Sequence, residues 1–379
     1  MATYKAPGVY VEEVPLIPAS IAQEPTSVVA FVGYAGPGAA GSTPVNIRSI
    51  SEFISLFGNN SGNKYLFDSI TLFYANGGGN CYVVPVGAAT DPVSFAALTQ
   101  GLEESKKLPV QLIAIPDACL LPAPEFYLLQ QQMLATAALL QDRFAILDTL
   151  QPAGNADSDG ELYRAGIGNN NLKWGAVYYP WLILSGGKQV PPCGAIAGLY
   201  ALTDNARGVW RAPANITVNG ITGVTVSITH DQQNTMNVSL DGKSINAIRA
   251  FSGQGVLVWG ARTLDGNSQD WRYISIRRTI TMIENSIKNS TGWVLFEPND
   301  ANTWVRIKSM IENYLLVLWR QGGLAGAKPD EAFSVDAGLG TTMTALDIQE
   351  GRLIISIKLA ITRPAEFIVI TLVHTLQQR

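Results

Sequence analysis

Two glycine-rich stretches are the first candidates for chemistry, because the backbone N–H groups of such stretches can bind phosphate. The stretch GYAGPG at 33–38 follows a predicted strand, but Pro37 interrupts it and no Lys-Ser/Thr pair follows. The stretch NGGGN at 76–80 follows a predicted helix and precedes a strand, which reverses the strand-to-helix order of a phosphate loop. We therefore expect ordinary connections here and predict no cofactor-binding residue.

An acidic stretch could bind a cation. Asn155, Asp157 and Asp159 have the spacing that opens a calcium loop, but Gly166 stands where a bidentate glutamate is required. A solvated loop is the better prediction, so no metal ligand is predicted.

Histidine and cysteine residues give no catalytic pattern. His230 and His374 are the two histidines, and neither lies in an H-E-x-x-H or G-x-S-x-G pattern. Cys81, Cys119 and Cys193 are odd in number and far apart, which favours small buried hydrophobic residues over disulfides or a metal site. No catalytic residue is predicted, although carboxylates that only the fold brings together stay possible.

Composition excludes one class of partner. The formal net charge is −4, with 26 Lys and Arg against 30 Asp and Glu, so the chain lacks the basic surface that nucleic acids require. Hydrophobic residues make up 47% of the chain and charged residues 15%, whereas about 25% charged is usual. We expect part of the surface to be covered by other copies of the chain.

The first residues, MATYKAPGVY, have no apolar run behind a positive region, and no segment has the roughly 18 apolar residues of a membrane span. We expect a soluble protein made without a secretion signal and without direct insertion into a membrane.

From residue 27 predicted strands and helices alternate, which favours an α/β layer with a mainly parallel sheet. The predicted strands are 27–34, 81–86, 110–115, 144–149 and 174–184, and the predicted helices are 49–57, 65–75, 92–105, 123–141 and 193–206. The stretch at 152–171 is predicted as a loop, and 216–242 as short turns and strands.

The last third changes to an α+β pattern. Isoleucines recur at helical spacing over 271–289, and apolar residues do so over 299–323, with Asn299 as a possible N-cap and Gly322 as a possible stop. Two strands, at 332–338 and 351–362, flank a turn-rich stretch. The predicted fold is therefore α/β and α+β: an α/β domain, then a mixed domain, with extended strands at both termini.

Both termini are strand-like. The C-terminal strand is apolar on both faces, which is a hazard at an open edge. The strand at 366–376 can turn back at Pro364 and close the sheet of its own chain, or it can add to the sheet of a neighbouring copy. Head-to-tail lending of this kind propagates into a ring or a helical array.

At this point the sequence resembles a known family, the sheath proteins of contractile phage tails, tailocins and extracellular contractile injection systems. The resemblance covers nearly the whole chain and is most like the injection-system branch. It rests on YKAPGVYVEEV, RAGIGNNNLKWGAVYYPWL, PPCGAIAGLYALTDNARGVWRAPAN, GVLVWGARTLDGNSQDWRYISIRRTITMIENSI, and the stretch from WVLFEPNDANTWVRIKSMIENYLLVLWRQGGLAG to the end.

The resemblance implies a woven lattice in which arms from two subunits add to a strand pair in a third. The implied inter-subunit donor residues are Val9, Tyr10, Val11, Glu12, Val14, Phe367, Ile368, Val369, Ile370, Leu372, Val373 and Leu376. The implied acceptor residues are Phe333, Val335, Leu353, Ile355, Ile357, Leu359 and Ile361.

The implied organisation is an N-terminal arm at 1–20, an outer α/β domain at 21–255, an inner domain at 256–363 and a C-terminal arm at 364–379. The implied function is a contractile sheath subunit and not an enzyme. Its partners would be other copies in stacked helical rings, an inner tube, a baseplate and a cap or terminator protein, with no nucleotide or other cofactor. Assembly would take place in the bacterial cytoplasm, and the particle would be released or docked at a membrane.

Residues that contact the tube are expected on two helices that combine an apolar stripe with a charged face. The candidates are Arg277, Arg278, Lys288, Arg306 and Lys308. Ordinary solvated faces would look the same in sequence.

Two other functions stay open from sequence alone. A static helical shell or fibre would use the same lent strands with a single packing. A nucleotide-dependent α/β enzyme would be stabilised by ATP, GTP or NAD in a thermal-shift screen.

Overall fold

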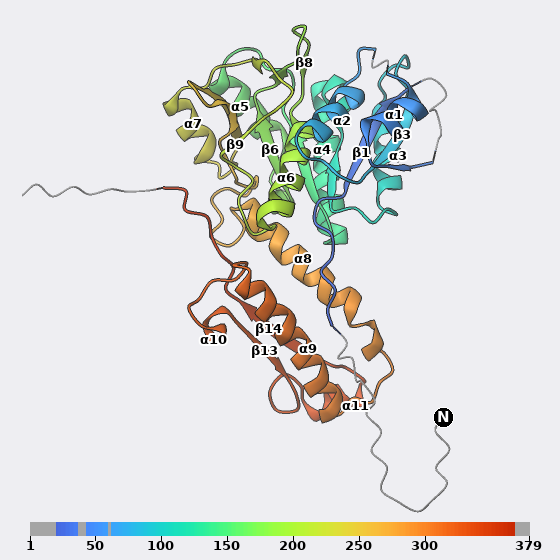
Figure 1. The fold of residues 1–379 in the computed structure, drawn as a ribbon, viewed down its shortest axis with the longest axis vertical. Coiled ribbons are helices and arrows are strands. Elements are labelled where there is room, and N and C mark those ends of the chain that lie inside the picture. The colour runs from blue at the N-terminus through green and yellow to red at the C-terminus, as the bar shows by residue number, and fades with distance from the viewer. Residues whose placement is uncertain (1–19, 37–42, 60–61, 368–379) are drawn as a thin grey trace, which may run out of the picture.

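The computed structural model of the chain describes residues 20–36, 43–59 and 62–367. In Figure 1 an α/β unit and a smaller unit of helices and a hairpin lie at opposite ends of an elongated molecule, and helix α8 (Ile274–Ser290) runs between them. The predicted fold class, an α/β part followed by a mixed part, is confirmed.

The α/β unit is built on a nine-stranded sheet of order β2-β3-β1-β4-β5-β6-β11-β12-β9. Its strands are β1 (Val29–Ala35), β2 (Val45–Ile47), β3 (Cys81–Ala88), β4 (Leu112–Ala114), β5 (Phe144–Asp148), β6 (Gly175–Tyr179), β9 (Ile216–Thr217), β11 (Asn246–Phe251) and β12 (Gly255–Val258). Strands β3, β1, β4, β5, β6 and β11 run parallel to their neighbours in that order, while β2, β12 and β9 pair antiparallel at the two edges. A second, three-stranded sheet has the order β10-β7-β8, and its strands are β7 (Leu182–Ile183), β8 (Gln189–Val190) and β10 (Gly223–Val224).

Helices cover both faces of the large sheet, which is why its central strands read as continuous apolar runs. Along β1, Val29 and Phe31 face one core, while Val32 and Tyr34 face the other. The first core includes side chains of α1 (Ile50–Phe57), α2 (Leu66–Ala75) and α6 (Cys193–Arg207). The second includes side chains of α3 (Phe95–Ser105), α4 (Ala123–Leu140), α5 (Ala156–Gly166) and α7 (His230–Asn237).

Two of these helices correct the sequence analysis. Helix α5 lies in the stretch predicted as a loop, and Asn155 caps it by accepting the backbone N–H groups of Asp157 and Ser158. Helix α7 lies in the stretch predicted as turns and strands, and Thr229 and Gln232 form its capping box. Both helices are polar, so they lack the apolar periodicity on which the predictions rested.

The smaller unit packs α9 (Ala301–Arg320) against the hairpin of β13 (Phe333–Ala337) and β14 (Ile355–Leu359). Ile307, Ile311, Leu315 and Leu318 form the buried stripe of α9. The remaining described elements of the whole chain are short helices: α10 (Pro329–Ala332), α11 (Ala345–Gln349), η1 (Pro116–Leu120), η2 (Leu172–Trp174) and η3 (Gly292–Val294).

The ends of α9 lie close to the prediction. The N-cap is Asp300, whose side chain accepts the N–H of Thr303, and not Asn299, which accepts the indole N–H of Trp304. At the other end the helix stops at Arg320, and Gly322 follows with φ +84°.

Helix α8 connects the cores of the two units. Ile274 at its start belongs to the first core of the α/β unit, and Ile283 near its end belongs to the core of the smaller unit. Strand β12 lies in the large sheet, so residues 256–258, which the sequence analysis placed in the inner domain, belong to the α/β unit.

Candidate assembly site

The hairpin β13–β14 is the sheet that the sequence analysis proposed as an acceptor. The two strands pair antiparallel with Phe333 opposite Leu359 and Ala337 opposite Ile355. Val335 is buried, and the hairpin packs on α9 through one face. In the part of the chain that the structure describes, this sheet has two strands, so each of them has one edge without a neighbouring strand.

The structure brings the predicted acceptor residues together. Phe333 and Val335 lie in β13, and the predicted residues between Ile355 and Leu359 lie in β14. Leu353 lies just before β14, and Ile361 lies just after it in an isolated bridge to Leu324.

Most of the predicted donor residues cannot be compared with the structure. Val9, Tyr10, Val11, Glu12 and Val14 lie outside the described residues. The same holds for Ile368, Val369, Ile370, Leu372, Val373 and Leu376, and for His374. Phe367 is described, lies outside any strand and is 71% exposed.

The chain that leaves β14 runs to the α/β unit, and the described residues after Pro364 do not turn back onto the hairpin (Figure 1). The Arg363 guanidinium donates to the carbonyl oxygen of Gln269 at 2.9 Å. Glu366 then forms an ion pair with Arg262, with 2.6 Å between Arg262 Nη2 and Glu366 Oε2.

Three side chains of the α/β unit hold Glu366. Arg262, which is 3% exposed, donates through Nε and Nη2, Asn237 Nδ2 donates to Oε1 at 2.6 Å, and the Tyr273 hydroxyl donates to Oε2 at 3.2 Å. Burial acts to raise the pKa of Glu366, but the hydrogen bonds from Arg262 and Asn237 outweigh it and hold that pKa below its usual value. The carboxylate therefore stays charged and anchors the root of the C-terminal segment.

This anchor could not be predicted from the sequence. Arg262 and Glu366 are 104 residues apart, and no local spacing relates them. Arg262 lies between β12 and α8, and Glu366 follows Pro364; neither position belongs to a sequence motif that would predict an ion pair.

Residues 20–28 lie along α8 on their way from the smaller unit to β1 (Figure 1). Ser290 Oγ accepts the N–H of Ala22 at 3.1 Å, and Ser286 Oγ accepts the N–H of Glu24 at 2.9 Å. Ile21 belongs to the core of the smaller unit. The root of the N-terminal segment is therefore in the smaller unit, whereas the root of the C-terminal segment is at the α/β unit.

Two of the predicted tube-facing residues are buried, which corrects the prediction. The Arg277 guanidinium lies between the rings of Trp174 and Trp271, at 4.3 and 4.4 Å from their centroids, and Arg277 is 3% exposed. Arg278 is 4% exposed and forms an ion pair with Asp204, with 3.0 Å between Nη1 and Oδ1. The prediction assumed that one face of α8 meets solvent, but that face is covered by the α/β unit.

The other three predicted tube-facing residues have accessible side chains. Lys288 and Arg306 are exposed, and Arg306 lies over the ring of Trp293 at 4.1 Å. Lys308 is half-buried and lies 3.7 Å from Glu312.

The crevice where doubly wound sheets bind ligands is filled by the protein itself. The strand order reverses between β1 and β4, and a ligand would lie at their carboxyl ends. There Asp117 Oδ2 accepts the N–H of Tyr34 and Oδ1 accepts the N–H of Tyr65, both at 2.7 Å. A Cβ atom at Gly33 would lie 2.6 Å from Asp117 Oδ2, so no room is left at this point for a phosphate.

The other candidates for chemistry have structural roles. Asn155 is a helix cap, and the described residues hold no group of His, Cys, Asp and Glu side chains that fits a metal ion. In the NGGGN turn, Asn76 exchanges hydrogen bonds with the backbone of Asn219. Cys81, Cys119 and Cys193 are free and buried, as predicted. Over the described ranges no helix is long and apolar enough to cross a membrane.

Two family models match the chain, the phage tail sheath protein central domain over residues 96–264 and the phage tail sheath C-terminal domain over residues 267–375. The boundary between the two matches lies shortly before α8.

Solved structures match over the whole chain. A chain of the PVC sheath complex of an extracellular contractile injection system, in the contracted state, is 32% identical with a TM-score of 0.80, and the match covers 100% of both chains. A chain of the anti-feeding prophage helical sheath in the contracted state is 35% identical with a TM-score of 0.77, covering 98% of this chain and 99% of that one. A chain of the 6-fold symmetrised anti-feeding prophage baseplate is also 35% identical with a TM-score of 0.76, covering 99% and 100%.

Among curated relatives, the tail sheath protein of Vibrio phage KVP40 is 32% identical over 137 residues. That match covers 36% of this chain and 20% of the length of the relative. Tail sheath proteins are structural proteins and not enzymes. Because the family models and the full-length structural matches agree, the chain belongs to the family of tail sheath proteins, on the branch of the extracellular contractile injection systems.

Proposed function

We propose that copies of this chain polymerise as a helical array of stacked rings around an inner tube. The array assembles in an extended, metastable state and contracts when a baseplate triggers it, driving the tube through a target membrane. A cap or terminator protein ends the array, and no nucleotide or other cofactor takes part. Assembly occurs in the bacterial cytoplasm, as part of a phage-tail-like particle. The support from relatives is that similar chains form a contracted helical sheath and lie in a baseplate structure.

The observation that carries the proposal is the unfinished sheet β13–β14. Its two edges can each accept a strand, one from the N-terminal segment of a neighbour (Val9–Val14) and one from the C-terminal segment of another (Phe367–Leu376). Each added backbone hydrogen bond contributes about 0.5–1.5 kcal/mol net. A lattice linked in this way keeps its subunits connected while the contacts between folded units change.

The positions of the two roots favour donation of the terminal segments to neighbouring copies over pairing of these segments with the chain's own hairpin. The N-terminal root is packed in the smaller unit through Ile21, and the C-terminal root is held at the α/β unit through Glu366. The two segments therefore leave the molecule from different units, so that they suit two different neighbours.

For the tube contact, the candidates are now Lys288, Arg306 and Lys308. Their positive side chains are accessible on the smaller unit and its connecting helix. A tube surface with carboxylates would fit them.

The test is a variant that ends at Phe367, produced with the complete set of particle proteins. We expect a folded monomer by size-exclusion chromatography and no sheaths by negative-stain electron microscopy. The matched control removes only residues 377–379, beyond the donor strand, and should assemble normally.

Ordered sheaths from the variant that ends at Phe367 would contradict strand lending. Contraction is tested on the control particles, which should occur in a long form and, after triggering, in a short and wider form. A single length under all conditions would instead favour a static shell.

A further inference from the structure

The loop at 238–243, which follows α7, carries a fully exposed leucine. Leu240 is 108% exposed and Val238 is 51% exposed. Beside them lies a surface hollow of about 450 Å³ whose wall includes Ala165 and Glu161 of α5. A single exposed leucine is common on protein surfaces, so the surroundings of the loop decide whether it has a role.

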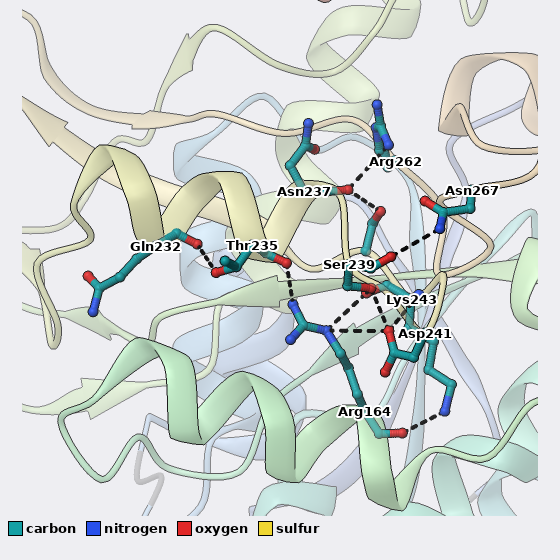
Figure 2. A network of polar contacts seen from close by, with 10 residues as sticks. Arg164, Gln232, Thr235, Asn237, Ser239, Asp241, Lys243, Arg262 and Asn267 are labelled. Atoms are coloured by element: carbon teal, nitrogen blue, oxygen red, sulfur yellow. Dashed lines mark hydrogen bonds and ion pairs between the residues drawn. The ribbon is translucent and has the colours of Figure 1, made fainter.

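Two buried cationic side chains, Arg164 of α5 and Lys243 at the end of the loop, link the loop to α5 (Figure 2). Arg164 Nε donates to the carbonyl oxygen of Lys243 at 3.1 Å, and its Nη2 donates to that of Thr235 at 2.8 Å. Lys243 Nζ in turn donates to the carbonyl oxygen of Arg164 at 2.6 Å, and Lys243 is 6% exposed. These reciprocal bonds tie the loop to α5.

Two further hydrogen bonds hold the loop, one within it and one from Asn267. Ser239 Oγ donates to Asp241 Oδ1, and Asn267 Nδ2 donates to the carbonyl oxygen of Ser239 at 3.0 Å (Figure 2). A rigid loop that presents an apolar side chain loses little conformational entropy when a partner covers it. The loop is therefore preorganised for a contact.

The position of the loop indicates which partner that is. Asn237, immediately before the loop, donates through its side chain to Glu366, while its carbonyl oxygen accepts a hydrogen bond from Arg262. The C-terminal segment thus leaves the described chain at Phe367, beside this loop. The predicted donor residues start at Phe367, and the twelve residues that follow it in the sequence could span at most about 40 Å.

We propose that Leu240 and the hollow beside it are the docking surface for the neighbouring copy that takes up this chain's C-terminal segment. This inference rests on the proposed function, because it requires a lattice of copies linked by that segment. The receiving copy covers Leu240 with an apolar side chain. The wall of the hollow adds no net charge, because the carboxylates of Glu161 and Asp241 are balanced by Arg164 and Lys243, and Arg164 lies 3.9 Å from Asp241.

The first experiment uses a photo-crosslinker. Leu240→p-benzoylphenylalanine in assembled particles should give, on illumination, an adduct with the mass of two sheath chains on a denaturing gel. Mass spectrometry should identify both halves as peptides of this chain. An adduct with the tube protein, or no adduct in intact particles, would overturn the inference.

The second experiment uses thiol reactivity, since the three native cysteines are buried. Maleimide should label Leu240→Cys rapidly in the monomer and at least tenfold more slowly in assembled particles. Unchanged labelling on assembly would overturn the inference.

The third experiment compares two exposed leucines. Leu240→Asp should leave the monomer folded and reduce the yield of particles at least tenfold, whereas Leu139→Asp, at a site that is 73% exposed on α4, should not. Normal yield from Leu240→Asp would count against the inference. If the wild-type chain formed no particles at all, the proposed function itself would fail, which separates the two outcomes.

Discussion

The α/β unit and the smaller unit complete their sheets in different ways. The large sheet has nine strands, its central strands are covered by helices on both faces, and its outermost strands β2 and β9 have three and two residues. Short edge strands leave little for another chain to pair with. The hairpin β13–β14 has five residues in each strand and open edges on both sides within the described chain.

The same contrast holds for ligand binding. In the α/β unit, the crevice that a doubly wound fold uses for ligands is closed by Asp117, which accepts backbone N–H groups from both sides. In the smaller unit, the outer edges of β13 and β14 have no neighbouring strand among residues 20–36, 43–59 and 62–367. The α/β unit therefore closes its own crevice, whereas the hairpin of the smaller unit has two edges at which the described chain places no further strand.

The largest expected effect tests whether the two units are separately stabilised. Leu315→Ala removes a fully buried side chain from the core of the smaller unit and should lower the free energy of unfolding by about 2–5 kcal/mol. Hydrogen exchange should lose protection in α9, β13 and β14 but not in β1, β4 and β5.

The matched control is Val317→Ala on the same helix, where the side chain is 49% exposed and the change should stay within about 0.5 kcal/mol. Equal loss of protection in both units for Leu315→Ala would contradict the comparison.

The next effect concerns pH. Burial raises the pKa of Asp148, at the end of β5, to about 7, and its Oδ1 accepts the N–H of Cys193 at 2.9 Å. The folded state therefore binds the proton more tightly than the unfolded state, whose carboxyl has a pKa of about 3.9. Stability from this group is greatest below pH 4 and falls by up to about 1.4 kcal/mol per pH unit until the pH passes about 7.

Asp148→Asn keeps an acceptor for Cys193 and should remove this slope, so its melting temperature should fall less than that of the wild type between pH 5 and 8. Burial raises the pKa of Asp117 to about 6, so a smaller slope should persist. The control Asp270→Asn, at an exposed site, should follow the wild type. Identical pH profiles for Asp148→Asn and the wild type would refute the assignment.

The smallest effect tests the link between the two regions. A double-mutant cycle with Arg262→Met and Glu366→Gln, followed by chemical denaturation, should give a coupling free energy of about 0.5–3 kcal/mol. Because the pKa of Glu366 is lowered in the folded state, this contribution is present above about pH 4.3 and is lost as the pH falls through the lowered value. A coupling near zero at pH 7 would mean that the ion pair does not hold the C-terminal root.

Much of the fold could be predicted from sequence because its signals are local. The apolar run of β1 and the buried stripe of α9 are each continuous in the chain. Helices α5 and α7 were missed because their evidence is polar capping at Asn155 and Thr229 and not apolar periodicity.

The site could be predicted only in part. The hairpin residues were found from two short apolar strands, but the anchor of Glu366 depends on Arg262, Asn237 and Tyr273, which only the fold brings together. Arg277 and Arg278 were misplaced for the same reason, since nothing within α8 reveals that a second unit covers its outer face.

Two segments, α8 and residues 20–28, run side by side between the units. They are linked by hydrogen bonds from the N–H of Ala22 to Ser290 Oγ and from the N–H of Glu24 to Ser286 Oγ. Helix α8 has 17 residues and is therefore about 26 Å long. Because two linked segments join the units, a rotation of the smaller unit would carry the α/β unit with it instead of bending the connection between them.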